Sequence, residues 1–341
     1  MTKNKRAIFL IFLILILLSA LGICVYRTIY APLDVDGTTY IYIDKDDDID
    51  SVRYKVNEIG CANMMVFDLC NALSHYKENI HTGRYSVSSE INTLDLFLKL
   101  RNHSTEPVML VVPSVRTMPE MAGRLSKQLM IDSVSLARAF TDSIWCESLG
   151  YTIQTIPALF IPDSYEMYWD VSLERLKTRL KQVNQEFWNS SRQKKAKEIG
   201  FTQTEVCTLA SIIDSETSAN QEKPIIAGLY INRLRKGMLL QSDPTVIFAI
   251  GDYSIRRVLK AHLQEDSPYN TYKYQGLPPG PIRVASIAGI DAVLNYNIND
   301  YLFMCAKEDF SGTHNFAVNS KEHSANARKY QLALNKKGIK K

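Results

Sequence analysis

The chain has 341 residues, of which 46% are hydrophobic and 22% are charged, a composition typical of folded domains and not of disordered segments. Its 40 Lys and Arg residues against 36 Asp and Glu residues leave a net charge of only +4, without a long basic tract or a nucleic-acid motif, so DNA and RNA are not expected partners. The length exceeds that of one typical domain, so two or three folded modules are expected.

The first predicted element is a membrane-spanning helix. Residues 7–26 carry no charge, and at about 1.5 Å per residue they match the ~30 Å hydrocarbon core of a bilayer. A cleaved signal peptide is the alternative, but the apolar stretch is longer than the usual range of about 7 to 15 residues and no small-residue cleavage site follows it. Basic residues precede the span, so the positive-inside rule predicts a single-pass protein with a cytoplasmic N-terminus.

A small αβ module is predicted after the span. Residues 38–43 alternate apolar and polar side chains as a strand does, and an Asp-rich turn follows, with Asp50 or Ser51 as the N-cap of a helix. The turn does not match an EF-hand loop, because Ser51 and Asn57 occupy the positions that require Gly and Glu. Periodicity then predicts helices over 51–59, 62–75 and 91–100 and a strand over 83–87.

The middle of the chain mixes strands and helices without a regular β-α-β alternation, which favours an α+β architecture. A strand is predicted at 108–112, a helix begins near Pro119, and an amphipathic helix covers 171–188. The aromatic run 159–169 is interpreted either as core packing or as a sugar-stacking surface. The polar, basic segment 189–197 is predicted to be an exposed loop or helix end.

The second half is predicted to hold helices at 206–217, 224–236, 284–295 and 321–334 and strands at 301–306 and 314–318. Its loops are rich in Pro, Gly, Asn and Tyr and offer the amide, hydroxyl and aromatic groups that a carbohydrate cleft uses. His314 and His323 lack the spacing of metal ligands, and neither a metal nor another cofactor is expected. The scattered cysteines after the span are expected to be small core residues, namely Cys61, Cys70, Cys146, Cys207 and Cys305.

The candidate catalytic group lies in the helix predicted at 206–217. At the helical period Glu216 falls inside the apolar arc that contains Leu209 and Ile213, whereas Asp214 lies at or beyond its edge. A carboxylate held against apolar surface has a raised pKa and can stay protonated near neutrality to act as a general acid. The two carboxylates are two positions apart on a helix and point to different sides, so they cannot flank one bond as the pair of a hydrolase does.

Arg233 is a second charged residue expected on the apolar face of a helix, beside Ile226 and Leu229. A buried guanidinium needs a partner, and either a carboxylate of the chain or an acidic group of a substrate would serve. Pairing with Glu216 would lower the pKa of that carboxyl group and weaken its use as an acid.

Five ordered motifs occur in the second half: Leu209-Ala-Ser-Ile-Ile-Asp-Ser-Glu-Thr217, Ile231-Asn-Arg-Leu-Arg-Lys-Gly-Met-Leu-Leu-Gln-Ser-Asp-Pro-Thr-Val246, Tyr269-Asn-Thr-Tyr272, Gly276-Leu-Pro-Pro-Gly-Pro-Ile282 and His314-Asn-Phe316. Together they resemble the YceG-like (MltG) family of endolytic murein transglycosylases. The resemblance implies a cytoplasmic tip and transmembrane anchor at 1–31, a LysM-like module at 32–105, and an α+β catalytic domain at 106–341 with its core motifs within 201–323. In the small module, Gly83-Arg-Tyr85 resembles the family's Gly-x-Tyr strand.

The resemblance also implies the reaction. Glu216 stands at the family's catalytic position, where it donates a proton to the glycosidic oxygen between N-acetylmuramic acid and N-acetylglucosamine. It then accepts the proton of the muramic C6 hydroxyl, which leaves a 1,6-anhydro end. The residues expected to contact the substrate are Asn232, Arg233, Gln241, Ser242, Asp243, Tyr269, Asn270, Thr271, Tyr272 and His314. A structural role stays open as the alternative for these residues.

The expected partners are peptidoglycan glycan strands, the inner (cytoplasmic) membrane of a bacterium through residues 7–26, and, from the resemblance alone, nearby cell-wall synthases. The body of the protein is then expected in the periplasm or another extracytoplasmic space, with a role in cell-wall assembly or strand-length control. Two alternatives stay open: a muramidase-type hydrolase of the same glycan, and a glycan-binding scaffold without catalysis.

Overall fold

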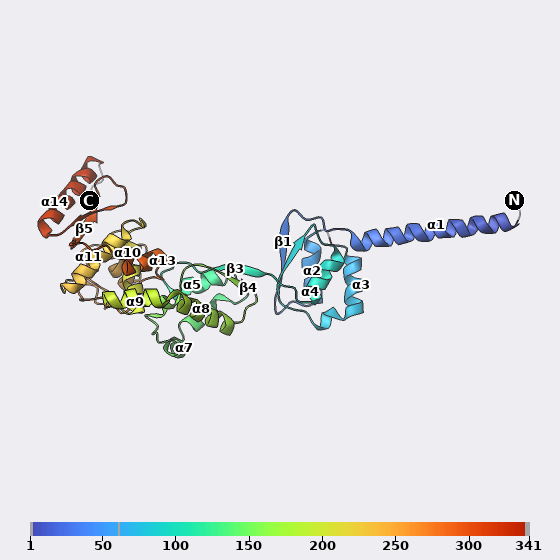
Figure 1. Ribbon diagram of the computed structural model, residues 1–341, viewed down its shortest axis with the longest axis horizontal. Helices are drawn as coiled ribbons and strands as arrows, with labels where there is room; N and C mark the ends of the chain where they lie inside the picture. Colours follow the sequence, from blue (N-terminus) through green and yellow to red (C-terminus); the bar gives the residue numbers. More distant parts are fainter. Residues whose placement is uncertain (1–2, 61, 338–341) are drawn as a thin grey trace. The chain divides into compact units, whose positions relative to one another are not determined.

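The computed structural model describes residues 3–60 and 62–337. The chain divides into two compact units, one made of Met1–Met109 and Glu166–Val171 and the other of Leu110–Tyr165 and Ser172–Lys341. Both units combine helices with short strands (Figure 1), and the mixed helix and strand architecture is thereby confirmed.

The N-terminal part of the described chain is one long helix, α1 (Lys3–Tyr30). Within it, Phe9–Tyr30 contains an 18-residue window with a mean hydropathy of 2.9, and none of that window is buried inside the protein. The predicted span of residues 7–26 lies within α1, so a helix long and apolar enough to cross a bilayer is confirmed there.

The first unit is built on an antiparallel pair of strands, in which Thr38 pairs with Ser88 and Ile43 with Gly83. In chain order its elements after α1 are β1 (Thr38–Ile43), α2 (Ile49–Glu58), α3 (Met64–Ser74), the 3-10 turn η1 (Tyr76–Glu78), β2 (Gly83–Ser88) and α4 (Thr93–Arg101). Inward-facing side chains of the strands and helices make one core, which includes Ile41, Ile43, Val52, Phe67, Tyr85, Val87, Leu96 and Phe97. The predicted order of strand, two helices, strand and helix is confirmed.

Two details of this unit have clear local causes. The predicted N-cap at Asp50 or Ser51 is wrong, because Asp48 caps α2 by accepting the backbone N–H of Ser51 at 2.8 Å. Gly83 has a φ of +143°, and a Cβ at this position would collide with the side chain of Thr105. Glycine is therefore required where β2 begins.

A second two-stranded sheet pairs β3 (Pro107–Val111) with β4 (Ser164–Tyr168), and the division between the two units falls within both strands. The strand predicted at 108–112 corresponds to β3. The strand β4 was not predicted, because it lies in the aromatic run 159–169. In that run Leu159, Phe160 and Ile161 are buried, which supports core packing there.

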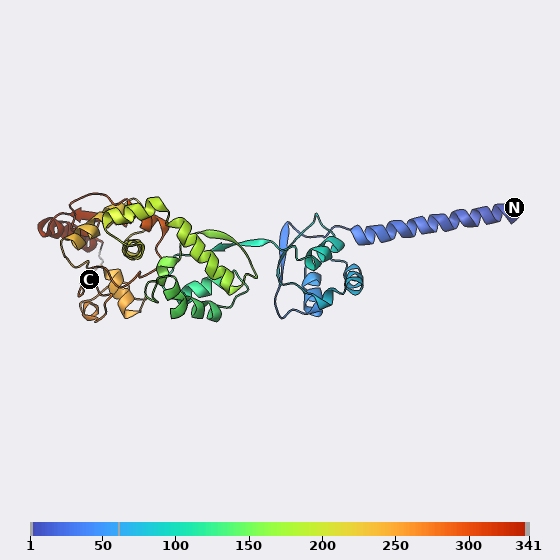
Figure 2. The same cartoon turned by 60° about the horizontal axis from the view of Figure 1, so that its bottom comes forward.

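The second unit is mainly helical. In chain order it contains α5 (Met118–Leu125), α6 (Ser133–Phe140), α7 (Ser143–Ser148), the 3-10 turn η2 (Ile156–Leu159), α8 (Leu173–Phe187), α9 (Ser190–Ile199), α10 (Gln203–Glu216), α11 (Lys223–Arg235), α12 (Asp243–Ile250), the 3-10 turn η3 (His262–Gln264), α13 (Ile287–Leu294), β5 (Phe303–Ala306), β6 (His314–Ala317) and α14 (Ser320–Lys336). The antiparallel hairpin of β5 and β6 packs against α14 (red in Figure 2).

Four helices of this unit differ from the prediction. No element was predicted over residues 133–148, where α6 and α7 lie. The other two are α9 and α12. Residues 189–197 were expected to be a loop or helix end, but they belong to α9, which Asn189 caps and which ends at Gly200 with a φ of +88°. The helix α12 was not predicted, although Pro244 lies in its first turn and Gly251 follows its end at a φ of +77°. Both short helices lack a clear apolar stripe, so periodicity alone did not reveal them.

The helix α10 runs through the core of the second unit. Every residue from Val206 to Ile213 is buried, and the helix packs against α9, α11, α12 and α13. At its N-terminus the side chains of Thr202 and Glu205 form a capping box. Because neighbours surround α10, packing fixes the directions of the side chains at its C-terminal end.

The cysteines that the structure describes are free thiols. Cys146 and Cys207 are buried, as expected of small core residues, whereas Cys70 and Cys305 are half-buried. Cys61 lies outside the described residues.

Candidate active site

Glu216 is the last residue of α10, and two hydroxyl groups hold its side chain. Tyr230 Oη on α11 donates to Glu216 Oε1 at 2.9 Å, and Ser242 Oγ, just before α12, donates to the same oxygen at 2.5 Å. The other carboxyl oxygen, Oε2, accepts no hydrogen bond from the residues that the structure describes. The carboxyl group is therefore fixed through one oxygen and free at the other.

The surroundings of Glu216 raise the pKa of its carboxyl group above the usual value. Burial is the largest cause; the hydrogen bonds from Ser242 and Tyr230 act against it, the Asp243 carboxylate adds to it, and His314 opposes it. Burial also raises the pKa of the Tyr230 hydroxyl well above 10, so this group stays a proton donor. A carboxyl group in this setting stays protonated to higher pH and can serve as an acid.

Glu216 is half-buried and lines a polar cavity of about 350 Å³, called the cleft below. Six of the residues predicted for the site line the cleft together: Glu216, Arg233, Gln241, Asp243, Tyr272 and His314. Ser242 lies behind them and reaches the cleft through its bond to Glu216. The fold therefore brings side chains from α10, α11, α12 and β6 to one place.

Asp214 was expected at or beyond the edge of the apolar arc, and the structure shows that its side chain is buried there by neighbouring helices. Its side chain is only 4% exposed and pairs with Lys223 Nζ at 2.8 Å. It also accepts the backbone N–H of Ser286 at 2.6 Å and the Ser286 hydroxyl at 2.8 Å, at the start of α13. A Cβ at Gly289 would come within 2.6 Å of the carboxylate, so glycine is needed there. Asp214 joins α10, α11 and α13 on the side away from Glu216.

Arg233 is buried, as predicted, but its partners are neutral. Its Nε and Nη1 donate to the carbonyl oxygens of Leu239 and Leu302, both at 2.8 Å, and its Nη2 donates to Gln241 Oε1 at 2.5 Å. Glu216 is not among these partners, so Arg233 does not hold that carboxyl group in its ionised form. Arg233 instead connects α11 to the segments that contain Leu239, Gln241 and Leu302.

Three of the predicted contact residues use their polar groups inside the protein, and a fourth packs its ring there. The amide groups of Asn232 and Asn270 donate to backbone carbonyl groups of neighbouring loops. The hydroxyl of Thr271 is buried and accepts the backbone N–H of Ser242 at 3.0 Å. Tyr269 packs its ring against an aromatic ring of α12. These contacts favour the structural alternative for the four residues.

Two residues of the site did not emerge from sequence reasoning as cleft residues. Glu222 is buried and binds His314, from which it is separated by 92 positions, so no local pattern could reveal the pair. His323, for which a structural or substrate-contact role was expected in preference to metal binding, lines the cleft beside Phe303. Its buried Nδ1 atom has no hydrogen-bond partner among the described residues. Its position depends on the packing of α14 on β5.

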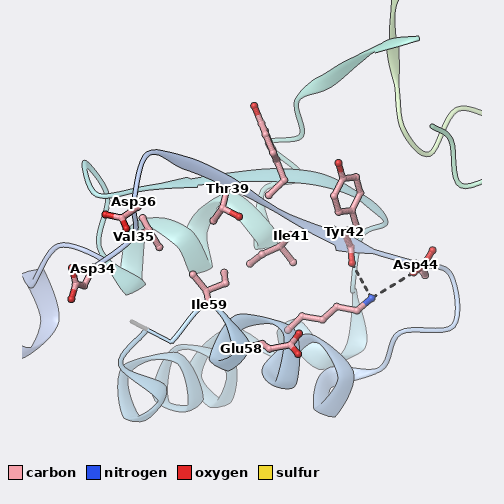
Figure 3. Close-up of a pocket in the computed structure, with 11 residues that line it drawn as sticks. Asp34, Val35, Asp36, Thr39, Ile41, Tyr42, Asp44, Glu58 and Ile59 are labelled. Carbon is pink, nitrogen blue, oxygen red and sulfur yellow. Dashed lines mark hydrogen bonds and ion pairs between the residues drawn. The ribbon is translucent and has the colours of Figure 1, made fainter. Parts of the chain in front are cut away.

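A second cavity, called the groove below, lies in the first unit between β1 and α2 and has a volume of about 610 Å³ (Figure 3). Tyr40 and Tyr42 contribute aromatic rings to it. Lys55 Nζ donates to the Tyr42 carbonyl at 2.9 Å and lies 3.5 Å from Asp44, as the dashed lines in Figure 3 show. The exposed carboxylates of Asp34, Asp36 and Glu58 and the apolar side chains of Val35, Ile41 and Ile59 also line the groove.

The chemistry of the cleft indicates which class of protein this is. A carboxyl group with a raised pKa, fixed by hydroxyl donors at the edge of a polar cavity, is the arrangement of a general-acid site. Residues 41–329 match the model of the YceG-like family, and the chain belongs to this family.

Similar proteins are found for both halves of the chain. It is 38% identical over 169 residues to the endolytic murein transglycosylase of Bacillus subtilis (strain 168), covering 49% of this chain and 46% of that protein. It is 24% identical over 361 residues to the endolytic murein transglycosylase of Streptococcus pneumoniae (strain ATCC BAA-255 / R6), covering 94% of this chain and 64% of that protein. The chain thus spans between about half and two thirds of these relatives.

A solved structure supports the fold. The crystal structure of a YceG-like protein from Listeria monocytogenes matches with a TM-score of 0.58 and 25% sequence identity. The match covers 84% of this chain and 98% of that one. The chain therefore has a YceG-like fold.

Proposed function

We propose that this chain is a membrane-anchored endolytic lytic transglycosylase of peptidoglycan. It is a carbon–oxygen lyase that cleaves the bond between N-acetylmuramic acid and N-acetylglucosamine within glycan strands, and it leaves 1,6-anhydro ends. The observation that carries the proposal is Glu216, a carboxyl group with a raised pKa and one free oxygen at the cleft. The names of the similar proteins support it. Its role is in cell-wall assembly or strand-length control.

The reaction begins with Glu216 protonated, because its raised pKa favours the neutral form. Oε2 donates the proton to the glycosidic oxygen, and positive charge develops on the muramic ring as the bond breaks. The Asp243 carboxylate and the Gln241 amide line the cleft and can stabilise that charge. The C6 hydroxyl of the same sugar then attacks the anomeric carbon. Its proton must be accepted in the cleft, and the Glu216 carboxylate left by the first step is one available acceptor.

A muramidase-type hydrolase is the second candidate, and Asp243 favours it. This carboxylate lines the cleft with Glu216 and is held by the Tyr272 hydroxyl at 2.6 Å. A retaining hydrolase uses a second carboxylate, about 5 to 5.5 Å from the acid, as its nucleophile. The product separates the two candidates, since hydrolysis leaves reducing ends that are heavier than anhydro ends by one water.

The rest of the chain anchors the protein in the membrane and binds glycan, which keeps the active site close to the cell wall. Residues 7–26 within α1 anchor the protein in the cytoplasmic membrane, with the basic N-terminus inside and the body outside. Residues 32–105 form a LysM-like module, for which the order of β1, α2, α3 and β2 and the tyrosines of the groove are the support. Residues 106–341 form the catalytic domain, and cell-wall synthases are proposed as neighbours.

The decisive experiment is digestion of purified peptidoglycan by the full-length chain in detergent, followed by mass spectrometry of the fragments. The wild type is expected to release fragments with 1,6-anhydro ends. Glu216→Gln is expected to lower the rate by about a thousandfold, since it removes the only group assigned to protonate the leaving oxygen. Glu198→Gln, an exposed position on α9, serves as the matched control and should cleave at the wild-type rate.

Folding of the Glu216→Gln variant can be checked independently. The raised pKa of Glu216 means that the folded state is destabilised when this group ionises, so the variant should unfold at the same temperature or higher above neutral pH. Reducing ends as the main product would select the hydrolase. Cleavage by Glu216→Gln at the wild-type rate would remove Glu216 from the mechanism. A wild type that binds peptidoglycan but releases nothing at any pH would indicate a glycan-binding scaffold.

A further inference from the structure

His314, which lines the cleft, and the buried Glu222 that contacts it have no role in the reaction described above. Glu222, before the first turn of α11, is 6% exposed, and both of its carboxylate oxygens contact His314 on β6. Oε1 accepts the backbone N–H of His314 at 2.8 Å, and Oε2 lies 3.1 Å from the ring atom Nδ1. A carboxylate can only accept, so Nδ1 carries a proton. In the neutral ring the lone pair is then on Nε2.

The second ring nitrogen of His314 is available to a substrate. The His314 side chain is 14% exposed and lines the cleft together with Glu216. Its Nε2 makes no hydrogen bond within the part of the chain that the structure describes. The cleft therefore contains two proton-transfer atoms that have no hydrogen-bond partner among residues 3–60 and 62–337, namely Oε2 of Glu216 and Nε2 of His314. One of them sits on a group that favours the protonated form, and the other presents a lone pair.

We propose that His314 is a second catalytic residue, which accepts the proton of the attacking C6 hydroxyl, and that Glu222 is the residue that positions it. The proposal rests on the transglycosylase function. As the bond from the anomeric carbon to the leaving oxygen breaks, that oxygen takes the proton of Glu216. As the new bond from O6 to the anomeric carbon forms, the hydroxyl proton goes to Nε2. The resulting carboxylate and imidazolium return to their starting forms by exchanging one proton through water.

The assignment of the acid and the base to two different residues is consistent with the contacts that hold their side chains. Tyr230 and Ser242 fasten Glu216 through one oxygen, and Glu222 fastens His314 through two contacts. Neither group has to swing between the leaving oxygen and the attacking hydroxyl. Preorganised partners of this kind lower the cost of reaching the transition state.

Several charged or titratable groups surround His314. Glu222 and the Thr217 hydroxyl that donates to it lie on one side of the ring. The groups that share the cleft with it are Glu216, Tyr230, Arg233, Asp243, Tyr272, Cys305 and His323.

The test uses His314→Asn in the full-length chain. The asparagine amide can still donate to Glu222, as Nδ1 does, but it provides no acceptor at the position of Nε2. We expect kcat to fall by about a hundredfold and KM to stay within about threefold. The unfolding temperature should stay near that of the wild type. Added imidazole should restore part of the rate of His314→Ala.

Glu222→Gln tests the positioning role. Glutamine keeps the shape but removes the charge, so a loss of about tenfold in kcat is expected. In combination with His314→Asn it should add little, because both changes affect the same proton transfer. Cleavage by His314→Asn within threefold of the wild-type rate would overturn the proposal. So would a lower unfolding temperature together with no rescue of His314→Ala by imidazole.

The failure of the proposal can be told apart from failure of the function itself. A wild type that depends on Glu216 but is indifferent to His314 overturns the role of His314 alone. A wild type that forms no anhydro ends overturns the transglycosylase function and, with it, the role assigned to His314.

Discussion

The cleft of the second unit and the groove of the first contain similar side chains in opposite surroundings. Both are lined by carboxylates and tyrosines, and the groove, at about 610 Å³, is larger than the cleft, at about 350 Å³. In the groove Glu58 is exposed to solvent, whereas in the cleft Glu216 is half-buried and held by two hydroxyl groups. In the cleft, burial raises the pKa of the Glu216 carboxyl group.

The comparison shows that cavity size does not identify the reactive site. Water screens the carboxylates of the groove, so they keep the character of surface charges. Behind the cleft, Asp214 and Lys223 form an ion pair whose side chains are 4% and 7% exposed. The groove offers a broad polar surface with aromatic rings, which suits binding, and the cleft offers a desolvated acid, which suits catalysis.

The largest effect is expected from the buried pair behind the cleft. Asp214→Asn leaves Lys223 without a counter-charge and should lower the free energy of unfolding by about 3–5 kcal/mol. Urea unfolding followed by tryptophan fluorescence measures the change, because Trp188 is buried in the same unit. The matched change in the groove is Asp44→Asn, beside the more exposed Lys55, with an expected loss below about 1 kcal/mol. Equal losses in the two regions would contradict the comparison.

A smaller effect is expected from the hydroxyl groups that hold Glu216. The hydrogen bonds from Ser242 and Tyr230 both lower the pKa of the Glu216 carboxyl group. Removing either hydroxyl group, in Ser242→Ala or Tyr230→Phe, should therefore raise the pKa of Glu216. An acid works below its pKa, so the alkaline side of the kcat/KM profile should move upward by about one pH unit, equivalent to about 1.4 kcal/mol. Tyr272→Phe is the control, because its hydroxyl bonds Asp243 instead. If Ser242→Ala and Tyr230→Phe leave the alkaline side of the kcat/KM profile unchanged, Glu216 is not the acid whose titration sets it.

The smallest effect is expected in the groove. Tyr40→Ala removes an aromatic ring that lines it and over which Arg84 lies at 3.7 Å. Binding to intact peptidoglycan, measured by sedimentation, should weaken by about two- to tenfold, the usual range for loss of one stacking surface. Cleavage of short glycan strands should not change. Glu58→Gln in the same groove is expected to bind as the wild type does, and a loss of turnover with Tyr40→Ala would show that the groove is not only a binding surface.

Much of the fold could be predicted from the sequence because its elements are amphipathic or capped. The strand at 38–43, the helix that became α11 and the hairpin near the C-terminus all carry local periodicity or turn residues. Helices α9 and α12 were not predicted, because one is polar all round and the other is short and lies between loop motifs. Helices α6 and α7 were not predicted either, although α6 is amphipathic and buries Leu136, Ala139 and Phe140.

The sequence by itself identified the candidate acid. At the helical period Glu216 falls on the same apolar arc as Leu209, Ile212 and Ile213, and this pattern is local, so it can be read without the fold. Only the tertiary structure decided what surrounds that acid: the hydroxyl groups of Tyr230 and Ser242, the burial of Asp214, and the contact of Glu222 with His314. Those partners lie up to 92 positions apart in the chain, and their pairing depends on packing that local periodicity does not encode.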